Sequence, residues 1–277
     1  MNKKHLTIVI TTFKSNNKVI NCLKTIPKNQ KIIVVENSND DNLKKKLEEK
    51  YPNLKCFVSN KNLGYAKGNN LALSKVKTKY ALILNPDALL SSSAIQNFFK
   101  TTKKIKNFAI IGPGNQSGKK NYKKYKFFIE VETIKGFAMF LNMKEFKKIG
   151  FFDQNFFIYL EEIDLCNRLR KENKKIFLDS SIEIYHQGGK SHDSNYNLQM
   201  ELSRNWHWMW SSFYYTKKHK GYLIALYAFF GKLMSSILKY YYYFFMCNNK
   251  KKLIYKQRML GLANSMIGNS SWYRPKI

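Results

Sequence analysis

The chain has 277 residues, of which 44% are hydrophobic, and a formal net charge of +31 from 49 basic and 18 acidic residues. This length suits one large or two small domains, and the apolar share is ample for a core. The charge favours an anionic partner: nucleic acid, a membrane surface or a phosphate-bearing substrate. Only five basic residues are arginine, the side chain on which base recognition relies, so the composition argues against a nucleic-acid reader.

The cysteines exclude two further classes of protein. Cys22, Cys56, Cys166 and Cys247 lie far apart, and no CxxC pair occurs. The chain therefore predicts neither a zinc site nor a disulfide framework, as is typical of a reducing cytosol. The apolar run near the N-terminus is short and continues into the first predicted strand, so no signal peptide is expected.

In the first half of the chain, short apolar runs alternate with segments of helical character. Strands are predicted at Leu6–Phe13, Lys31–Glu36, Leu54–Ser59 and Tyr80–Leu84, with helices at 16–26, 41–51 and 65–77 between them. This order predicts a Rossmann-like α/β fold with a mostly parallel sheet, right-handed crossovers and flanking helices.

The second half continues this pattern and then changes. It predicts a helix at 92–104, a strand at 108–112, a mobile basic loop at 113–126, a strand at 133–142, a helix at 161–172 and short strands at 175–179 and 182–186. After Ser191 the chain becomes aromatic and helical. We therefore expect a catalytic domain at 1–195 and a helical, basic extension at 196–277.

The strand Tyr80–Leu84 is apolar throughout, which is typical of a parallel strand buried on both faces. Asn85-Pro86 ends it because proline cannot donate to the ladder. Asp87 then lies just past the carboxyl end of a buried strand, where open α/β sheets bind ligands. A carboxylate there can help to hold a divalent cation against a phosphate. The alternative is an ordinary turn aspartate.

In the C-terminal extension, Lys232, Ser235, Ser236 and Lys239 form a narrow polar stripe on an otherwise apolar helix. The longest uninterrupted apolar run covers 222–231, whereas a spanning helix needs about 20 residues. We therefore expect a helix that lies in the membrane interface, with the lysines at 250–252 at anionic head groups. The alternative is a helix packed on the catalytic domain.

A series of short motifs supplies a further indication. In chain order they are Ile10-Thr11-Thr12-Phe13, Val34-Val35-Glu36-Asn37-Ser38, the segment 60–70 (NKNLGYAKGNN), Asn85-Pro86-Asp87, Gly136-Phe137-Ala138-Met139, Gly150-Phe151-Phe152-Asp153, the segment 159–169 (YLEEIDLCNRL) and the segment 184–191 (IYHQGGKS). In this order, the chain from Leu6 to Ser191 resembles the family 2 glycosyltransferases of the GT-A fold, in particular their rhamnosyltransferase-like branch.

The resemblance implies a metal site. Asp87 and His186 would lie at a divalent cation, Mn²⁺ or Mg²⁺, which neutralises the diphosphate leaving group. Asn85 stands where the family's DxD motif has its first acid, so the cation would depend more on substrate phosphates and water. Without the resemblance, His186 is more simply read as a buried structural histidine.

The acceptor hydroxyl must lose its proton to a carboxylate. Glu161, Glu162 and Asp164, at the start of the predicted helix, are the catalytic candidates. Their structural alternative is helix-dipole compensation and an Asp164–Arg168 ion pair. The resemblance implies Glu162 as the base, and because the family usually has Asp there, Glu161 stays open as the base instead.

The resemblance also implies a binding site for the nucleotide sugar. A carboxylate at the second strand end can accept a hydrogen bond from the base or the ribose. The implied donor-binding residues lie at strand ends and in the segment 60–70: Thr11, Thr12, Phe13, Glu36, Asn62, Gly64, Lys67, Asn69 and Asn85.

Together these features predict an inverting, metal-dependent glycosyltransferase. It would move a rhamnose-like sugar from a dTDP- or UDP-sugar to a lipid-linked or cell-surface glycan, as a peripheral protein on the cytoplasmic face of the inner membrane. The expected partners are the donor, the acceptor and an anionic membrane surface, and not nucleic acid. Two alternatives remain: a basic nucleic-acid-binding protein, and a catalytically inactive relative, which the Glu36 and Glu162 departures suggest.

Overall fold

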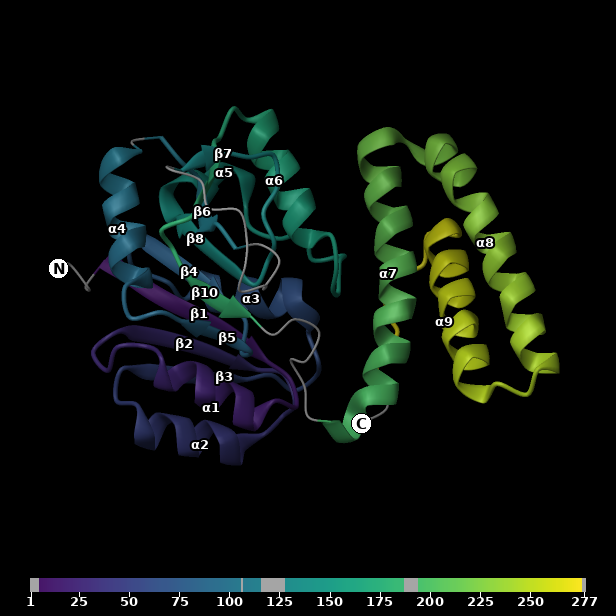
Figure 1. The fold of residues 1–277 in the computed structure, drawn as a ribbon, viewed down its shortest axis with the longest axis horizontal. Coiled ribbons are helices and arrows are strands. Elements are labelled where there is room, and N and C mark those ends of the chain that lie inside the picture. The colour runs from purple at the N-terminus through teal and green to yellow at the C-terminus, as the bar shows by residue number, and fades with distance from the viewer. Residues whose placement is uncertain (1–4, 106, 116–127, 187–193, 276–277) are drawn as a thin grey trace. The chain divides into compact units, whose positions relative to one another are not determined.

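The computed structural model describes residues 5–105, 107–115, 128–186 and 194–275 (Figure 1). Most of the predicted basic loop at 113–126 and the last motif residues, 187–191, lie outside these ranges. The chain forms two compact units. The first comprises residues 1–152 and 162–193, and the second comprises residues 153–161 and 194–277. The predicted division into domains at residue 195 stays a prediction.

The first unit is built on an eight-stranded sheet in the order β3-β2-β1-β4-β8-β6-β9-β7. The strands β1 to β4 run parallel, as the alternating pattern predicts, whereas β8 runs antiparallel to both of its neighbours. The bounds are Leu6–Thr12 (β1), Lys31–Glu36 (β2), Leu54–Val58 (β3), Tyr80–Leu84 (β4), Ile110–Pro113 (β6), Ile129–Glu130 (β7), Ala138–Asn142 (β8) and Ile176–Asp179 (β9).

Two short strands lie outside this sheet. β5 (Ala88–Leu90) and β10 (Ile184–His186) pair antiparallel in a small sheet of their own. The sequence predicts a strand at 182–186 but misses β5, which has only three residues.

The helices of the first unit follow the predicted order, except that the short α5 and the 3₁₀ turn before it are not predicted. They are α1 (Asn16–Lys24), α2 (Asp41–Lys50), α3 (Gly64–Ser74), α4 (Ala94–Lys104), α5 (Phe146–Ile149) and α6 (Glu161–Lys171), with a 3₁₀ turn at Met143–Glu145. The carboxylate of Asp40 caps α2 by accepting from the backbone N–H of Leu43 at 2.9 Å. α2 packs on β3, and α3 packs on β1 and β2.

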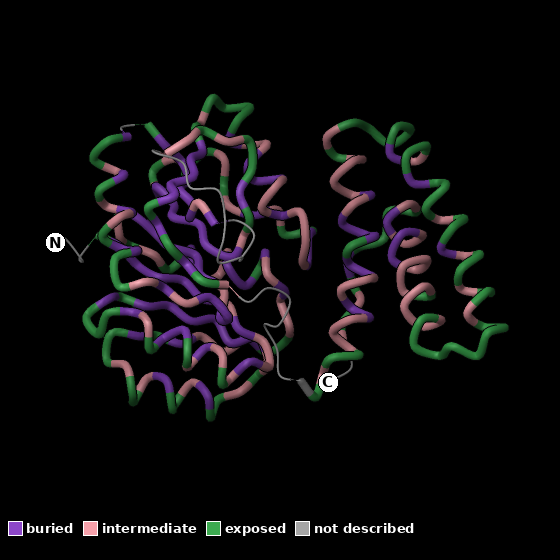
Figure 2. Tube along the Cα trace, viewed as in Figure 1, coloured by how far each residue is buried: buried purple, intermediate pink, exposed green. Residues whose placement is uncertain are grey.

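The central strands carry the core. Every residue of β4 and of β8 is buried, which confirms the prediction for the run Tyr80–Leu84 (Figure 2). Phe140 of β8 stacks on Phe98 of α4 with ring centroids 4.8 Å apart. The pairing of β4 with β1 and β8 places the residues that follow its end.

The second unit contains three long helices, α7 (Asn197–Lys220), α8 (Tyr222–Phe245) and α9 (Asn249–Met266), after a 3₁₀ turn at Ser194–Tyr196. Each of the three helices packs against the other two. The segment 153–161 belongs to this unit too. Its core cluster consists of Met209, Phe213, Ala225, Phe229 and Leu262.

The contact of α9 with α7 at Gly261 gives a test of this packing. A Cβ at Gly261 would lie 2.2 Å from the backbone oxygen of Trp206, so Gly261→Ala should lower the free energy of unfolding by about 1–3 kcal/mol. Gly231→Ala in α8 is the control. No described atom lies within 4 Å of the position that a Cβ at Gly231 would take, and alanine favours a helix by about 1 kcal/mol. Thermal denaturation followed by circular dichroism measures both, and an unchanged G261A would contradict the close contact.

Candidate functional site

The turn after β4 places an aspartate beside a histidine. The chain leaves β4 at Asn85, whose carbonyl accepts from the N–H of Ala88 at 3.1 Å. β5 then pairs antiparallel with β10, so that Ala88 lies opposite His186. As a result, Nε2 of His186 lies 3.3 Å from Oδ1 of Asp87. The structure thus brings together the two predicted metal ligands, which are 99 positions apart in the chain by their numbers.

The carboxylate of Asp87 is buried, with the imidazole of His186 beside it. The aspartate side chain is 2% exposed, and neither oxygen has a hydrogen-bond donor among the described residues. The His186 ring stacks on Phe137 at 4.6 Å, and its Nε2 lies 3.5 Å from the amide nitrogen of Asn85. Buried carboxylate oxygens without donors are costly unless a cation or a proton compensates them.

These residues fit a divalent cation that is completed by its substrate. Within the described residues, no group of three or more His, Cys, Asp or Glu side chains could hold a metal. Asp87 and His186 would therefore supply two ligands, and phosphate oxygens and water the rest, as magnesium and manganese sites in phosphate chemistry allow.

A thiol lies under the same turn. Cys22 Sγ lies 3.7 Å from the carbonyl oxygen of Asn85. Burial, and secondly the charge of Asp87, raise the pKa of Cys22 far above its usual range. The neutral thiol packs beneath the turn and is no metal ligand, because thiolates are the binding form.

The segment before β8 lies between the Asp87–His186 pair and α6, the helix that begins with the catalytic candidates. The backbone N–H of Asn85 donates to the carbonyl of Phe137 at 2.8 Å, and the hydroxyl of Tyr65 donates to the carbonyl of Gly136. A Cβ added at Gly136 would lie 3.7 Å from Cβ of Glu162. A glycine thus suits position 136, because the first turn of α6 comes close to the backbone there. The motif Gly136-Phe137-Ala138-Met139 marks this segment in the sequence, whereas nothing in the sequence indicates the role of Tyr65.

The three catalytic candidates have different surroundings. Glu162 is partly exposed and belongs to the first unit, whereas Glu161 is buried and belongs to the second. Asp164 is fully buried, and its Oδ2 accepts from Nε of Arg168 at 2.8 Å. The guanidinium of Arg168 also donates to the carbonyls of Ile149 and Phe151. Asp164 therefore forms the ion pair with Arg168 that the sequence offers as the structural alternative to a catalytic role.

The residues at the ends of β1 and β2 are largely engaged with the protein itself. Thr12 Oγ1 lies 2.6 Å from Oγ of Ser15. The buried carboxylate of Glu36 accepts from the backbone N–H groups of Ser38 and Asp40 at 2.8–2.9 Å. In contrast, the buried Oγ1 of Thr11 has no hydrogen bond to any part of the chain that the structure describes. The nucleotide-binding role of Glu36 stays a prediction, and these two donors do not use all of the acceptor sites of the carboxylate.

The segment 60–70 turns closely over the end of β1. Asn62 Oδ1 accepts from the N–H of Gly64 at 3.0 Å, and Gly64 has φ of 74°. Asn69 Nδ2 donates to the carbonyl of Tyr65, while its buried Oδ1 has no donor among the residues described. A Cβ at Gly68 would lie 2.6 Å from Cγ2 of Thr11. The segment thus packs against Thr11 and carries an orphaned acceptor on Asn69.

The two remaining predicted donor-binding residues are less buried. Lys67 is exposed, and Phe13 is half-buried. Their roles toward a nucleotide sugar stay predictions.

The segment that precedes the acid pair is held by the C-terminal unit. Tyr159 and Leu160 have φ of 76° and 68°, a left-handed conformation that costs about 1–3 kcal/mol for such residues. The hydroxyl of Ser211 in α7 donates to the carbonyl of Ile158 at 2.9 Å. The Phe157 ring stacks on His207 of α7 at 4.4 Å. The segment up to Glu161 is thus held by contacts within the helical unit.

His207 links α7 to the C-terminal tail. Its Nε2 lies 2.9 Å from the carbonyl of Tyr273, and its Nδ1 lies 2.9 Å from Oγ of Ser271. A carbonyl only accepts, so Nε2 carries the proton and Nδ1 accepts from the serine. The Arg274 guanidinium lies 3.9 Å from the centre of the Phe157 ring. Apart from its aromatic composition, nothing in the sequence pattern indicates this cluster.

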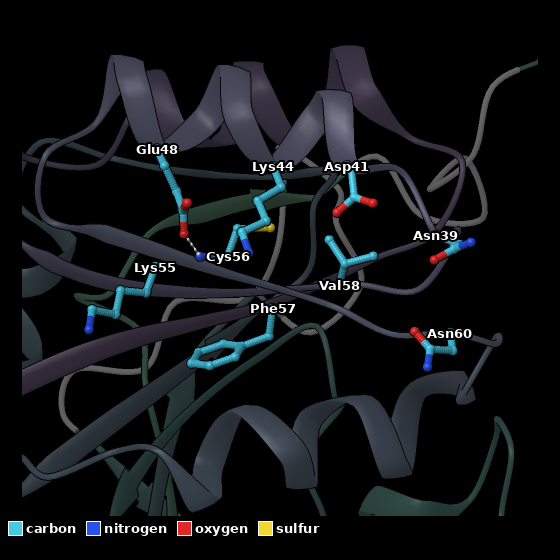
Figure 3. A pocket seen from close by; sticks show the side chains of 9 residues that line it. All are labelled: Asn39, Asp41, Lys44, Glu48, Lys55, Cys56, Phe57, Val58 and Asn60. Atoms are coloured by element: carbon cyan, nitrogen blue, oxygen red, sulfur yellow. Dashed lines mark hydrogen bonds between the residues drawn. The ribbon is translucent and has the colours of Figure 1, made fainter.

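One groove lies apart from these residues (Figure 3). It has a volume of about 480 Å³, and its lining comes from α2, β3 and their flanking turns: Asn39, Asp41, Lys44, Glu48, Lys55, Cys56, Phe57, Val58 and Asn60. Oε1 of Glu48 accepts from the backbone N–H of Cys56 at 2.9 Å. β3 is an edge strand, and an occupied outward N–H with a nearby carboxylate discourages strand addition there. The predicted site residues do not belong to this lining.

The sheet, the aspartate–histidine pair at its carboxyl edge and the acid helix define a GT-A fold, the class of nucleotide-sugar glycosyltransferases. The chain belongs to the family described as glycosyl transferase family 2, whose model matches residues 7–167. The family and the fold that the motifs predict are thereby confirmed.

Two similar proteins are named as sugar transferases. The chain is 26% identical over 212 residues to the low-salt glycan biosynthesis hexosyltransferase Agl10 of Haloferax volcanii, covering 65% of this chain and 66% of that protein. It is 24% identical over 211 residues to the rhamnosyltransferase WbbL of Escherichia coli K12, covering 63% of this chain and 78% of that protein.

Solved structures share the fold. The mannosyltransferase PcManGT from Pyrobaculum calidifontis, in complex with GDP-Man and Mn²⁺, matches with a TM-score of 0.59 and 11% identity, over 95% of this chain and 87% of that one. S. aureus TarS matches with a TM-score of 0.55 and 16% identity, over 72% of this chain and 38% of that one.

The variant Asp87→Asn tests the metal site by a measurement that does not depend on catalytic activity. Removing a buried charge that has no hydrogen-bond donor among the described residues should raise the free energy of unfolding of the metal-free protein. The gain that Mn²⁺ gives, about 2.7 kcal/mol at 100 times its Kd, should be lost. Asp164→Asn is the matched control: it breaks the pair with Arg168, costs about 3 kcal/mol, and keeps the Mn²⁺ response. Thermal shifts with and without Mn²⁺ measure both, and an undiminished response in D87N would contradict the assignment.

His207 makes the stability of the helical unit depend on pH. Burial lowers the pKa of His207 from 6.5 to about 3. Between these values the unfolded chain binds a proton that the folded protein does not, so the free energy of unfolding falls as the pH falls below 6.5. The slope should approach 1.36 kcal/mol per pH unit, about that of one proton. His207→Gln should flatten this slope in denaturant titrations. A wild-type slope in H207Q would contradict the assignment.

Proposed function

We propose that this chain transfers a rhamnose-like sugar from a dTDP- or UDP-sugar to a lipid-linked or cell-surface glycan, with inversion and with a divalent cation. The observation that carries the proposal is the buried carboxylate of Asp87 beside His186 at the carboxyl edge of the sheet, without a hydrogen-bond donor in the described chain. A phosphate-bound cation would satisfy it. The names of the two relatives, a hexosyltransferase and a rhamnosyltransferase, support sugar transfer.

The metal proposal has independent support. Besides the mannosyltransferase with GDP-Man and Mn²⁺, GalNAc-T7 with UDP, GalNAc and Mn²⁺ matches the fold, with a TM-score of 0.55. When bound, the cation would neutralise charge on the leaving diphosphate. Asp87 and His186 would hold it, and the stacking of the imidazole on Phe137 would keep the ring in place.

In the transfer step, the residues of α6 would handle the proton. Glu162 is partly exposed and lies at the Gly136 approach, which suits a base that must meet an acceptor hydroxyl. Glu161 is buried and is the alternative. Thr11 and Asn69, each with a buried oxygen that no described group donates to, would accept hydrogen bonds from the donor substrate. One in-line displacement then inverts the anomeric centre.

The place of the reaction follows from the acceptor. A lipid-linked glycan lies in a membrane, so we propose that the protein works as a peripheral protein on the cytoplasmic face of the inner membrane. A third relative, a teichoic acid poly(glycerol phosphate) polymerase of Staphylococcus epidermidis, is 31% identical over 103 residues, which are 34% of this chain and 14% of that protein. Its name also concerns a cell-envelope polymer.

Glu162→Gln tests the base. Turnover should fall by about 10²- to 10⁴-fold while donor affinity is kept, because the interaction exists only in the transition state. Glu161→Gln is the matched control and should change turnover little. Radiolabelled sugar transfer from the donor gives turnover, and donor-induced thermal shifts give affinity. The reverse pattern would make Glu161 the base. Equal, full activity of both variants, or a wild type that neither transfers sugar nor hydrolyses the donor, would contradict the proposed function.

A further inference from the structure

Helix α8 exposes a continuous apolar face. At 3.6 residues per turn, residues three or four apart share one side of a helix. Seven of the large exposed side chains of α8 follow this spacing, and we call this set the α8 outer face: Leu223 (78% exposed), Tyr227 (90%), Phe230 (56%), Met234 (38%), Leu238 (70%), Tyr241 (55%) and Phe245 (78%). Monomeric proteins rarely expose such a surface unless a partner covers it.

The opposite side of α8 packs within its own unit. Ala225, Phe229 and Ser236 are buried there, and Phe229 meets Phe213 of α7 at 5.9 Å between ring centres. Lys239 lies over the ring of Tyr255 in α9 at 5.4 Å. Of the polar stripe that the sequence shows, Ser236 is buried, whereas Lys232, Ser235 and Lys239 stay exposed at the edge of the bundle.

The charge around this face is mainly positive. No acidic residue follows Glu201 in the sequence. Lys250, Lys251 and Lys252 open α9 directly after the turn that ends α8. Lys250 pairs with Glu201 at 2.9 Å, whereas Lys251 and Lys252 lie over the rings of Tyr243 and Phe244, at 5.0 and 5.6 Å. This surface complements an anionic partner. A second copy of the same basic surface would repel it, which argues against a dimer through this face.

The length of α8 does not decide how it would meet a membrane. Among the described helices it alone is long and apolar enough to cross one, so the short apolar run in the sequence does not exclude crossing. The packing of α8 against α7 and α9 argues against a helix that crosses the membrane. α7 and α9 lie against α8 and carry charged residues such as Lys217, Lys256 and Arg258. A crossing α8 would draw these charges toward hydrocarbon, at a large cost.

We propose that the α8 outer face and Lys250–Lys252 form a docking surface for an anionic lipid bilayer, with α8 lying along the interface. The apolar side chains enter the boundary between head groups and acyl chains, while the lysines meet anionic head groups. Tyrosine and phenylalanine at the end of α8 suit this boundary. The proposal rests on the proposed function only for the identity of the membrane, where a lipid-linked acceptor would lie.

Sedimentation of the whole chain with vesicles tests this surface. The vesicles contain phosphatidylglycerol and phosphatidylcholine in equal parts, or phosphatidylcholine alone. Tyr227→Gln with Leu238→Gln should weaken binding about a hundredfold. Lys250→Gln, Lys251→Gln and Lys252→Gln together should weaken binding to the anionic vesicles about tenfold to a hundredfold. The wild type should be partly released by high salt and should be fully extracted from membranes by alkaline carbonate.

The matched control is the lysine run of α2. Lys44→Gln, Lys45→Gln and Lys46→Gln together remove the same charge from the first unit and should leave vesicle binding unchanged. An equal loss in this control would assign binding to overall charge and overturn the proposal. So would wild-type binding by the Tyr227/Leu238 variant, resistance to carbonate extraction, or a dimer in light scattering that this variant abolishes.

Two measurements keep this test apart from that of the catalytic site. Circular dichroism should show that all variants keep the helical content of the wild type, since the changed side chains of α8 are exposed. Donor-induced thermal shifts should be the same in all of them. Loss of vesicle binding with a retained donor response supports the docking surface. Intact vesicle binding without any donor response would contradict the proposed function and leave the docking surface supported.

Discussion

The site depends on one constraint, the burial of a carboxylate to which no described group of the protein donates a hydrogen bond. Asp87 is held at a two-stranded sheet, and the facing imidazole of His186 is itself fixed by Phe137. A folded chain retains such a group only where something else satisfies it. The surrounding elements position this site. Asp87 follows the end of β4, and His186 is the last residue of β10. The segment before β8 lies between both residues and the start of α6.

Local pattern determines the part of the fold that can be predicted from sequence. The run Tyr80–Leu84 specifies a strand buried on both faces, and Pro86 specifies its end, so Asp87 could be placed at the carboxyl edge of the sheet. The direction of β8 is not encoded in its composition, because an apolar strand between two others reads the same either way. β5 has too few residues for any periodicity, although it positions His186.

The same limits apply to the site residues. Glu36 has the right type and position at a strand end, but its carboxylate binds the N–H groups of Ser38 and Asp40, which only coordinates reveal. Asp164 and Arg168 could be paired from their spacing alone. The contact of Tyr65 with Gly136 joins residues 71 positions apart, and no single-sequence pattern predicts a hydrogen bond over that separation.

The segment 153–161 has a consequence for the second unit. Tyr159 and Leu160 adopt left-handed conformations, and the segment is tied to α7 by the hydroxyl of Ser211 and by the stacking of Phe157 on His207. Strained backbone of this kind persists only where its surroundings over-determine it. Loss of these ties would therefore let the two residues relax, while α7, α8 and α9 keep their contacts with one another.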